Sequence, residues 1–171
     1  LASTALQDPE TLPYIDVMAT HSYGINVNNV PNLPISKAAG VKIWQTEYMN
    51  QGSPGDNSFV NNTMTDGLKW ARLMGDMFTI PNLNAYFWWW PAANNGADGS
   101  DLIRLCNDGF PQYPTPSENG LYRVFKRYYA FGNYSRFIEP GFYMIGADKT
   151  PVSGVMITAY KDPASGNFTI V

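Results

Sequence analysis

Hydrophobic positions in the first half of the chain gather into three short runs, each of strand length and each bounded by Gly or Pro. The runs are rich in β-branched and aromatic residues, which favours β-strands over buried helical segments. Each run passes directly into polar or aromatic residues. The pattern therefore predicts three strands, over Tyr14–Thr20, Val41–Thr46 and Asn84–Trp90.

Helical patterns separate the predicted strands. Between the second and third runs, apolar residues repeat at steps of four and three until Pro81, which predicts one long helix with a single apolar face. A shorter helix is predicted over Ile35–Ala39, with Gly40 in the position after its end. The apolar face of the long helix is expected to comprise Val60, Met64, Leu68, Ala71, Met74 and Phe78.

Strands and helices that alternate in this way are typical of a parallel α/β fold. A doubly wound sheet is one form of that fold, but no Gly-rich phosphate loop follows any of the runs, so little supports a nucleotide site. A (β/α)8 barrel is the other form, and it needs roughly 250 residues. Only about three strands fit here, and by length the sequence is about half of a barrel.

The pattern changes after the third run. A long polar loop from Ala92 to about Ser117 is expected to be functional, because such loops are uncommon inside compact domains. A helical face of Leu121, Val124, Phe125, Tyr128 and Tyr129 then stops at Gly132. From Tyr134 onward, short apolar runs alternate with turn residues, which predicts antiparallel strands. We place a boundary near 132–134, giving units over 1–132 and 133–171.

Composition and charge exclude several partners. The chain has 171 residues, with 11 Lys and Arg against 14 Asp and Glu, so its net charge is −3 when His21 is neutral. No basic stripe is available to bind nucleic acid. No apolar run reaches the roughly 18 residues that a membrane helix needs. With one His, one Cys (Cys106) and no clustered ligand spacing, neither a metal nor another cofactor is expected.

The compartment is indicated only weakly. Asn-x-Ser/Thr triplets at Asn61, Asn133 and Asn167 favour secretion. The first ten residues are polar and mixed and begin with Leu, so they contain no signal peptide. We expect the natural N-terminus to lie upstream of these residues.

Chemically useful side chains stand at the ends of all three predicted strands. His21 and Tyr23 follow the first, Glu47 follows the second, and Trp88–Trp90 end the third. Of the four glutamates, Glu10, Glu118 and Glu139 lie in polar or turn segments, and only Glu47 terminates an apolar strand. A partly desolvated carboxylate needs a hydrogen bond or a cation, and the Tyr23 hydroxyl is a suitable donor. A solvated strand-end charge is the alternative.

The tryptophans alternate along their strand, so Trp88 and Trp90 share one side and Trp89 takes the other. At least one should reach the strand-end rim, where a flat ring can stack on the C–H face of a sugar; packing inside the fold is the alternative. His21 is equally compatible with a structural imidazole and with an acid or base. Ser/His/Asp catalysis lacks its Gly-x-Ser-x-Gly elbow, and nothing activates Cys106 for chemistry with His21.

Four motifs, by their order and spacing along the chain, resemble family 30 glycoside hydrolases. Trp44–Tyr48 is similar to the family's seventh-strand nucleophile motif, His21–Tyr23 to the end of its sixth strand, and Phe87–Trp90 to its eighth. Tyr134–Phe142 resembles the phrase that opens the family's β-sandwich side domain. The resemblance covers nearly the whole chain and implies an α/β fold, namely the C-terminal part of a (β/α)8 TIM barrel over 1–132 and part of an antiparallel β-sandwich over 133–171.

The resemblance further implies a retaining glycosidase with Glu47 as the nucleophile and Tyr23 as the residue that orients it. Trp89 would be the main sugar platform, with His21, Trp88 and Trp90 as further substrate contacts. Retaining chemistry needs a second carboxyl group about 5–5.5 Å away. In the family it belongs to a Glu after an Asn, and no Asn-Glu pair exists in this chain. We therefore expect the acid/base to lie on a companion N-terminal half-barrel, and this chain alone to be inactive.

The substrate implied by the resemblance is a β-linked polysaccharide, with xylan favoured. Family members that bind a uronate carry arginines just after the eighth strand, where this chain has Pro91–Asn95; Arg104 lies further along the loop. The alternatives are hydrolysis of β-1,6-glucan or another β-glycoside, a non-catalytic carbohydrate-binding half-barrel, and a swapped homodimer of half-barrels.

Overall fold

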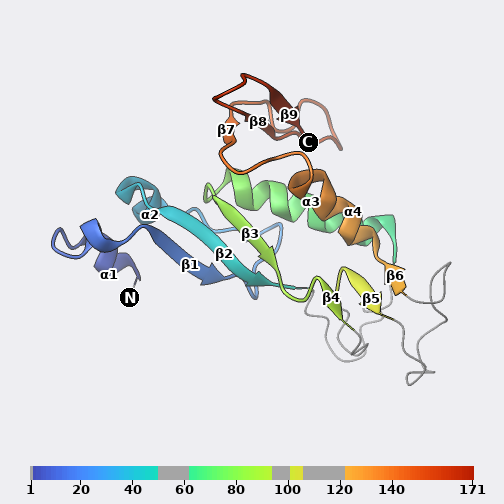
Figure 1. Ribbon diagram of the computed structural model, residues 1–171, viewed down its shortest axis with the longest axis horizontal. Helices are drawn as coiled ribbons and strands as arrows, with labels where there is room; N and C mark the ends of the chain where they lie inside the picture. Colours follow the sequence, from blue (N-terminus) through green and yellow to red (C-terminus); the bar gives the residue numbers. More distant parts are fainter. Residues whose placement is uncertain (1, 50–61, 94–100, 106–121) are drawn as a thin grey trace.

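A computed structural model describes residues 2–49, 62–93, 101–105 and 122–171 (Figure 1). Several residues named above lie outside these ranges: Val60, Asn61, Cys106, Glu118 and Leu121. The described chain begins with α1 (Ala2–Gln7) and a 3-10 turn, η1 (Leu12–Tyr14). Within the described ranges, no helix combines the length and apolar character needed to cross a membrane.

The three predicted strands exist and form one parallel sheet in the order β1-β2-β3. They span β1 (Val17–His21), β2 (Lys42–Tyr48) and β3 (Ala85–Trp88). The short predicted helix is α2 (Pro34–Ala39), and Gly40 follows it with φ of 70°, a left-handed conformation that glycine adopts without steric cost. Because the strands are parallel, all three strand ends meet at one edge of the sheet.

The long predicted helix is α3 (Met64–Thr79), and the Thr63 hydroxyl caps it by accepting from the Asp66 amide at 3.2 Å. Its predicted apolar face was partly wrong, because Met64 and Leu68 are exposed. Steps of four and three fit more than one face of a helix, and tertiary contacts choose among them. The buried apolar residues of α3 are Trp70, Leu73, Met74 and Met77.

The second predicted helix differs from α4 (Lys126–Ser135) in its start, its end and its buried face. Tyr122–Val124 is strand β6, α4 continues past Gly132, and Tyr128 and Tyr129 are exposed. The side chains that α4 buries are Arg127, Ala130 and Tyr134. The aromatic residues of this segment misled the prediction of its buried face, because one of the buried positions is Arg127. Its Nε lies 3.3 Å from Asp66 Oδ2.

Small residues on α3 allow α4 to approach closely. A Cβ atom added at Gly67 would lie 3.2 Å from Lys126 Cβ, and one added at Gly75 would lie 2.9 Å from the Tyr134 hydroxyl. Between them, the Ala71 carbonyl accepts from that same hydroxyl at 3.4 Å. The positions 67, 71 and 75 are spaced by four residues, so they lie on one side of α3.

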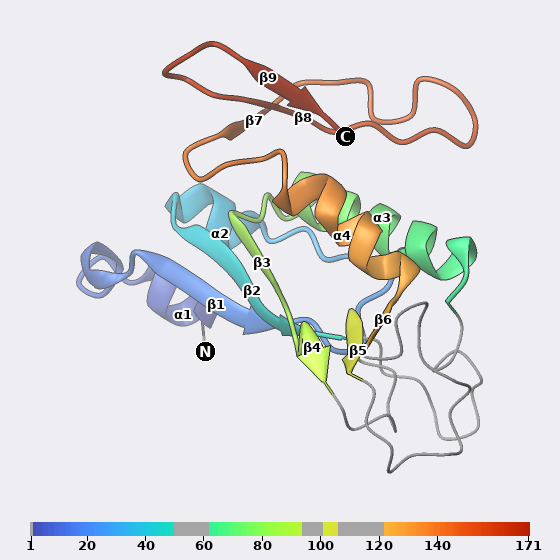
Figure 2. The ribbon, with the colours of Figure 1, turned by 45° about the vertical axis from the view of Figure 1, so that its right-hand side comes forward.

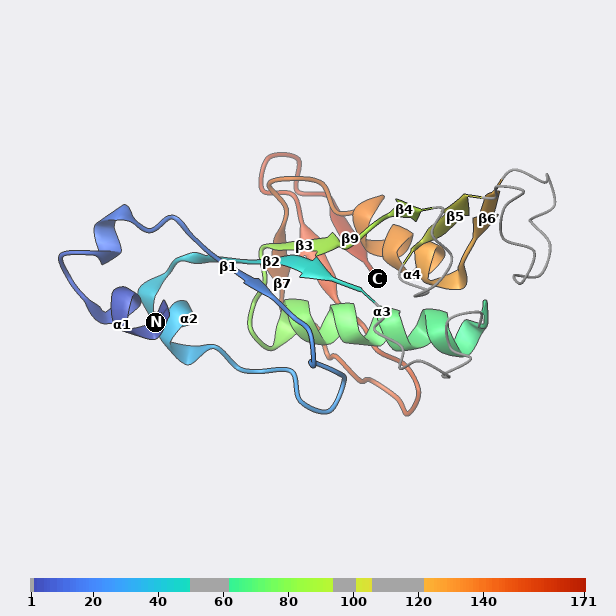
Figure 3. The same cartoon turned by 90° about the horizontal axis from the view of Figure 1, so that it is seen from below.

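Parts of the segment expected to be a long irregular loop form a small sheet instead. Its strands are β4 (Ala92–Ala93), β5 (Ile103–Leu105) and β6, with β4 parallel and β6 antiparallel to β5. Figure 3 shows this sheet beyond the carboxyl end of β3, with α1 and α2 at the opposite end of the parallel strands. The remainder of that predicted loop lies outside the described residues.

The predicted antiparallel strands at the end of the chain are β7 (Tyr143–Ile145), β8 (Ala159–Lys161) and β9 (Phe168–Ile170). Phe137 and Ile138, also expected in a strand, follow α4 in a turn. Figure 2 shows α3 and α4 between this sheet and the parallel sheet. An ion pair from Lys149 to the buried Asp76 of α3 links the two layers.

Candidate active site

The carboxyl ends of β1 and β2 bring three polar side chains together. His21 is the last residue of β1 and pairs with Glu47 of β2, while Tyr23 lies in the turn that follows β1. The Ser22 amide donates to the Glu47 carbonyl at 3.2 Å, which continues the strand pairing past the end of β1. In open and closed parallel α/β sheets, this edge is where ligands bind.

A β-bulge in β2 determines the direction of Glu47. Thr20 pairs with Gln45 but His21 pairs with Glu47, so Thr46 is an extra residue relative to β1. The pairing with β3 shows the same insertion, since Gln45 to Tyr48 spans one residue more than Tyr86 to Trp88. Without the bulge, Glu47 would lie on the same side of β2 as the buried Ile43, toward the helices. The bulge turns the Glu47 side chain to the other side, and Tyr48 is buried against Trp70 in its place.

Both carboxylate oxygens of Glu47 have partners. The Tyr23 hydroxyl donates to Oε1 at 2.5 Å, and His21 Nε2 lies 3.4 Å from Oε2. The side chain of Glu47 is 21% exposed, so water still reaches it. The rings of His21 and Tyr23 meet edge to face, with centroids 5.9 Å apart.

Tyr23 stays protonated in this arrangement. Burial raises the pKa of the Tyr23 phenol well above its ordinary value, and the hydrogen bond and negative charge of Glu47 raise it further. The phenol therefore remains a hydrogen-bond donor to the carboxylate at neutral pH. The expected pairing of Tyr23 with Glu47 is present, and His21 joins the same cluster.

The three tryptophans are placed differently from one another. Trp89 is 37% exposed, and its amide donates to the Tyr48 carbonyl at 3.0 Å. Trp90 has φ of 57°, and its ring stacks on that of Trp89 with centroids 5.7 Å apart. Trp88 is buried against Trp70 and Phe131, at centroid distances of 4.5 and 6.5 Å. As a correction, Trp88 belongs to the packing between sheet and helices and is not placed for contact with a sugar.

Arg104 forms an ion pair within its own segment. Its guanidinium binds both carboxylate oxygens of Asp101, with 2.7 Å from Nη2 to Oδ1, and Asp101 is buried. The same guanidinium carbon lies 5.6 Å from the Phe125 ring centroid. Arg104 therefore has an acidic and an aromatic partner close to the small sheet in which it lies.

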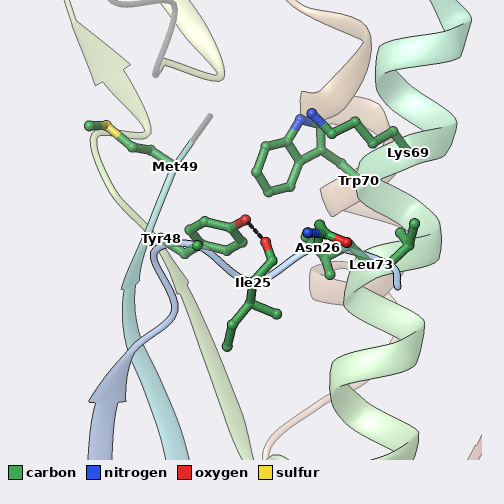
Figure 4. A pocket seen from close by; sticks show the side chains of 9 residues that line it. Ile25, Asn26, Tyr48, Met49, Lys69, Trp70 and Leu73 are labelled. Atoms are coloured by element: carbon green, nitrogen blue, oxygen red, sulfur yellow. Dashed lines mark hydrogen bonds between the residues drawn. The ribbon is translucent and has the colours of Figure 1, made fainter. Parts of the chain in front are cut away.

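A pocket of about 250 Å³ lies between the turn after β1, the end of β2 and α3 (Figure 4). The Tyr48 hydroxyl donates to the Ile25 carbonyl across it, and Trp70 and Leu73 form part of its wall. Tyr48 lies on the helix-facing side of β2, so this pocket is behind Glu47 and separate from its carboxylate. Within the described part of the chain, no group of three or more His, Cys, Asp or Glu side chains could hold a metal ion.

Comparison with known proteins gives a consistent picture. A glucuronoxylanase, XynC of Bacillus subtilis, is 28% identical over 163 residues, which are 94% of this chain and 33% of XynC. Among solved structures, the family 30 subfamily 8 xylanase Xyn30A of Clostridium acetobutylicum is 27% identical, with a TM-score of 0.67 over 94% of this chain and 34% of its own. The resemblance to family 30 glycoside hydrolases is confirmed.

A second family 30 structure, the endoxylanase of Clostridium papyrosolvens C71, is 25% identical with a TM-score of 0.63, over 95% of this chain and 35% of its own. No family model matches the sequence. This chain therefore spans about a third of the length of the family 30 relatives that it matches.

Two features of the site were missed by reasoning from the sequence. The hydrophobic pattern gives no sign of the bulge at Thr46. An uninterrupted strand, with Trp44 and Thr46 on one side and Glu47 on the other, fits the sequence equally well. The left-handed backbone of Trp90 is equally hidden, because this conformation is rare for bulky residues and no glycine marks it. Pro91, the next residue, was the one local sign that the strand ends near Trp90.

Proposed function

We propose that this chain is the C-terminal part of a secreted, retaining glycoside hydrolase of family 30 that cleaves a β-linked polysaccharide, xylan in the first place. In this proposal the parallel sheet and its helices, over residues 1–132, are part of a (β/α)8 barrel. Residues 133–171 are part of a β-sandwich side domain. The names of the relatives and the order of elements support this assignment.

The observation that carries the proposal is the Glu47 carboxylate, held at a strand end by Tyr23 and His21 and still open to water. In the first step its oxygen attacks the anomeric carbon, and the bond from that carbon to the leaving oxygen breaks. A protonated acid donates a proton to the departing oxygen. Water then attacks the glycosyl-enzyme, giving its proton to the same acid/base and releasing Glu47, so the configuration is retained.

The partners of Glu47 suit this role. The Tyr23 hydrogen bond fixes one carboxylate oxygen, which directs the other toward a bound sugar without the cost of orienting it during reaction. Trp89 is proposed as the platform on which that sugar stacks. His21, beside the second oxygen, is proposed as a contact to substrate and carboxylate alike.

The second carboxyl group is proposed to come from a companion N-terminal half-barrel, because no Asn-Glu pair, the motif that carries the acid/base in the family, occurs in residues 1–171. Both groups act as a unit, so the loss of either removes nearly all turnover. On this basis, residues 1–171 alone should hydrolyse xylan at no measurable rate, and addition of the companion segment should restore hydrolysis.

Covalent trapping tests the proposal. The complete protein is incubated with a 2-deoxy-2-fluoro xyloside that carries a good leaving group, digested, and analysed by mass spectrometry. We expect a glycosyl adduct on the peptide that contains Glu47. Glu47→Gln should abolish both the adduct and turnover, whereas Glu139→Gln, at an exposed turn, should leave both unchanged.

An adduct on another residue, or turnover by Glu47→Gln, would contradict the assignment of the nucleophile. A non-catalytic carbohydrate-binding role is the second candidate, and the exposed indole of Trp89 favours it. It predicts saccharide binding without hydrolysis, even when the companion segment is present. Parallel assays with xylan and β-1,6-glucan decide between the two substrate classes.

A further inference from the structure

The backbone at Trp90 is strained. Among the described residues, only Asn82 and Trp90 combine a side chain with a positive φ, at 63° and 57°. Asn tolerates this region because its short polar side chain can bond locally, but for a bulky residue the conformation is a genuine outlier. Such strain persists only where the surroundings hold it, and it is concentrated at functional sites.

The strain has a clear geometric consequence. In an extended strand, Trp90 would turn to the same side as Trp88, toward the helices. The left-handed turn brings its ring onto Trp89 instead, with centroids 5.7 Å apart and planes 26° from parallel. Trp89 is tied to β2 through its amide, and its indole remains 37% exposed. One face of an exposed indole is thus supported by a second ring.

We propose that Trp90 is a positioning residue that fixes the Trp89 indole as a rigid platform for a pyranose ring of a bound β-linked saccharide. This inference rests on the proposed function for the class of ligand. An indole that is already ordered loses little freedom when a sugar stacks on it, so the support increases affinity without a new contact to the sugar. The contact between the two rings is favourable and offsets part of the backbone strain.

The alternative is that Trp90 serves only to turn the chain from β3 into β4. The two roles make opposite predictions for glycine. Trp90→Gly fits the left-handed backbone better than tryptophan does but removes the supporting ring. Trp90→Phe retains a ring and the strain. Asn82→Gly is the matched control, because it relieves the same backbone conformation at the other end of β3, away from Glu47.

The experiment is a calorimetric titration with xylohexaose of the complete protein and these three variants, each carrying Glu47→Gln so that the ligand is not hydrolysed; turnover is measured separately without that change. We expect Trp90→Gly to raise the Kd by about 3- to 10-fold, the equivalent of one aromatic pair. Trp90→Phe should stay within about 2-fold of the wild type, because a second ring still supports the platform. Asn82→Gly should bind as the wild type does.

Unchanged or tighter binding by Trp90→Gly would overturn the proposal and leave a turn as the role of this residue. A wild-type protein that does not bind xylohexaose would overturn it as well. Binding that depends on Trp90 in a protein without turnover would instead refute the proposed hydrolase and leave this inference standing. If Trp90→Gly does not fold, Trp90→Asn makes the same comparison, because Asn also tolerates a positive φ.

Discussion

Replacement of Gly75 by alanine tests how closely α3 and α4 pack. Gly75 lies in the middle of α3, where glycine is normally unfavourable. A Cβ atom at this position would lie 2.5 Å from Met156 Cε and 2.9 Å from the Tyr134 hydroxyl. The end of the Met156 side chain can swing away. The Tyr134 ring cannot do so easily, because it is buried and packs against Phe78 at 5.5 Å.

Two opposing terms set the expected magnitude. Alanine in place of glycine in a helix interior gains about 0.8–1 kcal/mol of helix propensity. Insertion of a methyl group into a well-packed contact costs roughly 1–3 kcal/mol. The clash therefore outweighs the gain, and we expect Gly75→Ala to lower the free energy of unfolding by about 1 kcal/mol.

Gly132 provides the matched control. It also lies within a helix, but a Cβ atom there would meet nothing within 4 Å. Gly132→Ala should therefore raise the free energy of unfolding by about 0.5–1 kcal/mol. Urea unfolding of the complete protein, followed by circular dichroism, measures both variants. If Gly75→Ala stabilises the protein as much as Gly132→Ala does, then α3 and α4 do not pack as closely as described, and our argument for the small residues of α3 is wrong.

Two further predictions concern ionisable groups. Burial raises the pKa of Asp66 and Arg127 opposes that rise, so Arg127→Met should lower the free energy of unfolding by about 3–5 kcal/mol at pH 7. A carboxyl group whose pKa is raised in the folded state stabilises the fold less as pH rises toward that pKa. The difference in free energy of unfolding between wild type and Arg127→Met should therefore be smaller at pH 4 than at pH 7. An equal difference at both pH values, measured by urea unfolding, would argue against an ionic role. Hydrogen bonds from Ser165 and the Ala164 amide lower the pKa of Asp162, so Asp162 stabilises the fold above its ordinary pKa of 3.8 and loses this advantage as pH falls through the lowered value. Thermal unfolding should show Asp162→Asn less stable than wild type at pH 7 and equal to it at the acid end, and a difference that persists there would contradict the assignment.

The strands and their parallel order could be predicted because each run is short, apolar and bounded by residues that stop regular structure. Helix faces were predicted less well. Met64 and Leu68 fit the apolar repeat of α3 but are exposed, because the two layers that cover α3 contact other sides of it. The buried face of α4 was missed because an arginine, Arg127, occupies a core position next to Asp66, a partner 61 residues earlier in the chain.

The candidate site divides in the same way. The sequence by itself determined which residues stand at the strand ends, namely His21, Tyr23, Glu47 and the tryptophans, because strand boundaries depend on local composition. Only the tertiary structure decided which way they face. Thr46 is an extra residue only relative to neighbouring strands, and Trp90 has a left-handed backbone with its ring stacked on Trp89. Side-chain direction at the end of a strand depends on pairing between distant segments, and one inserted residue reverses it.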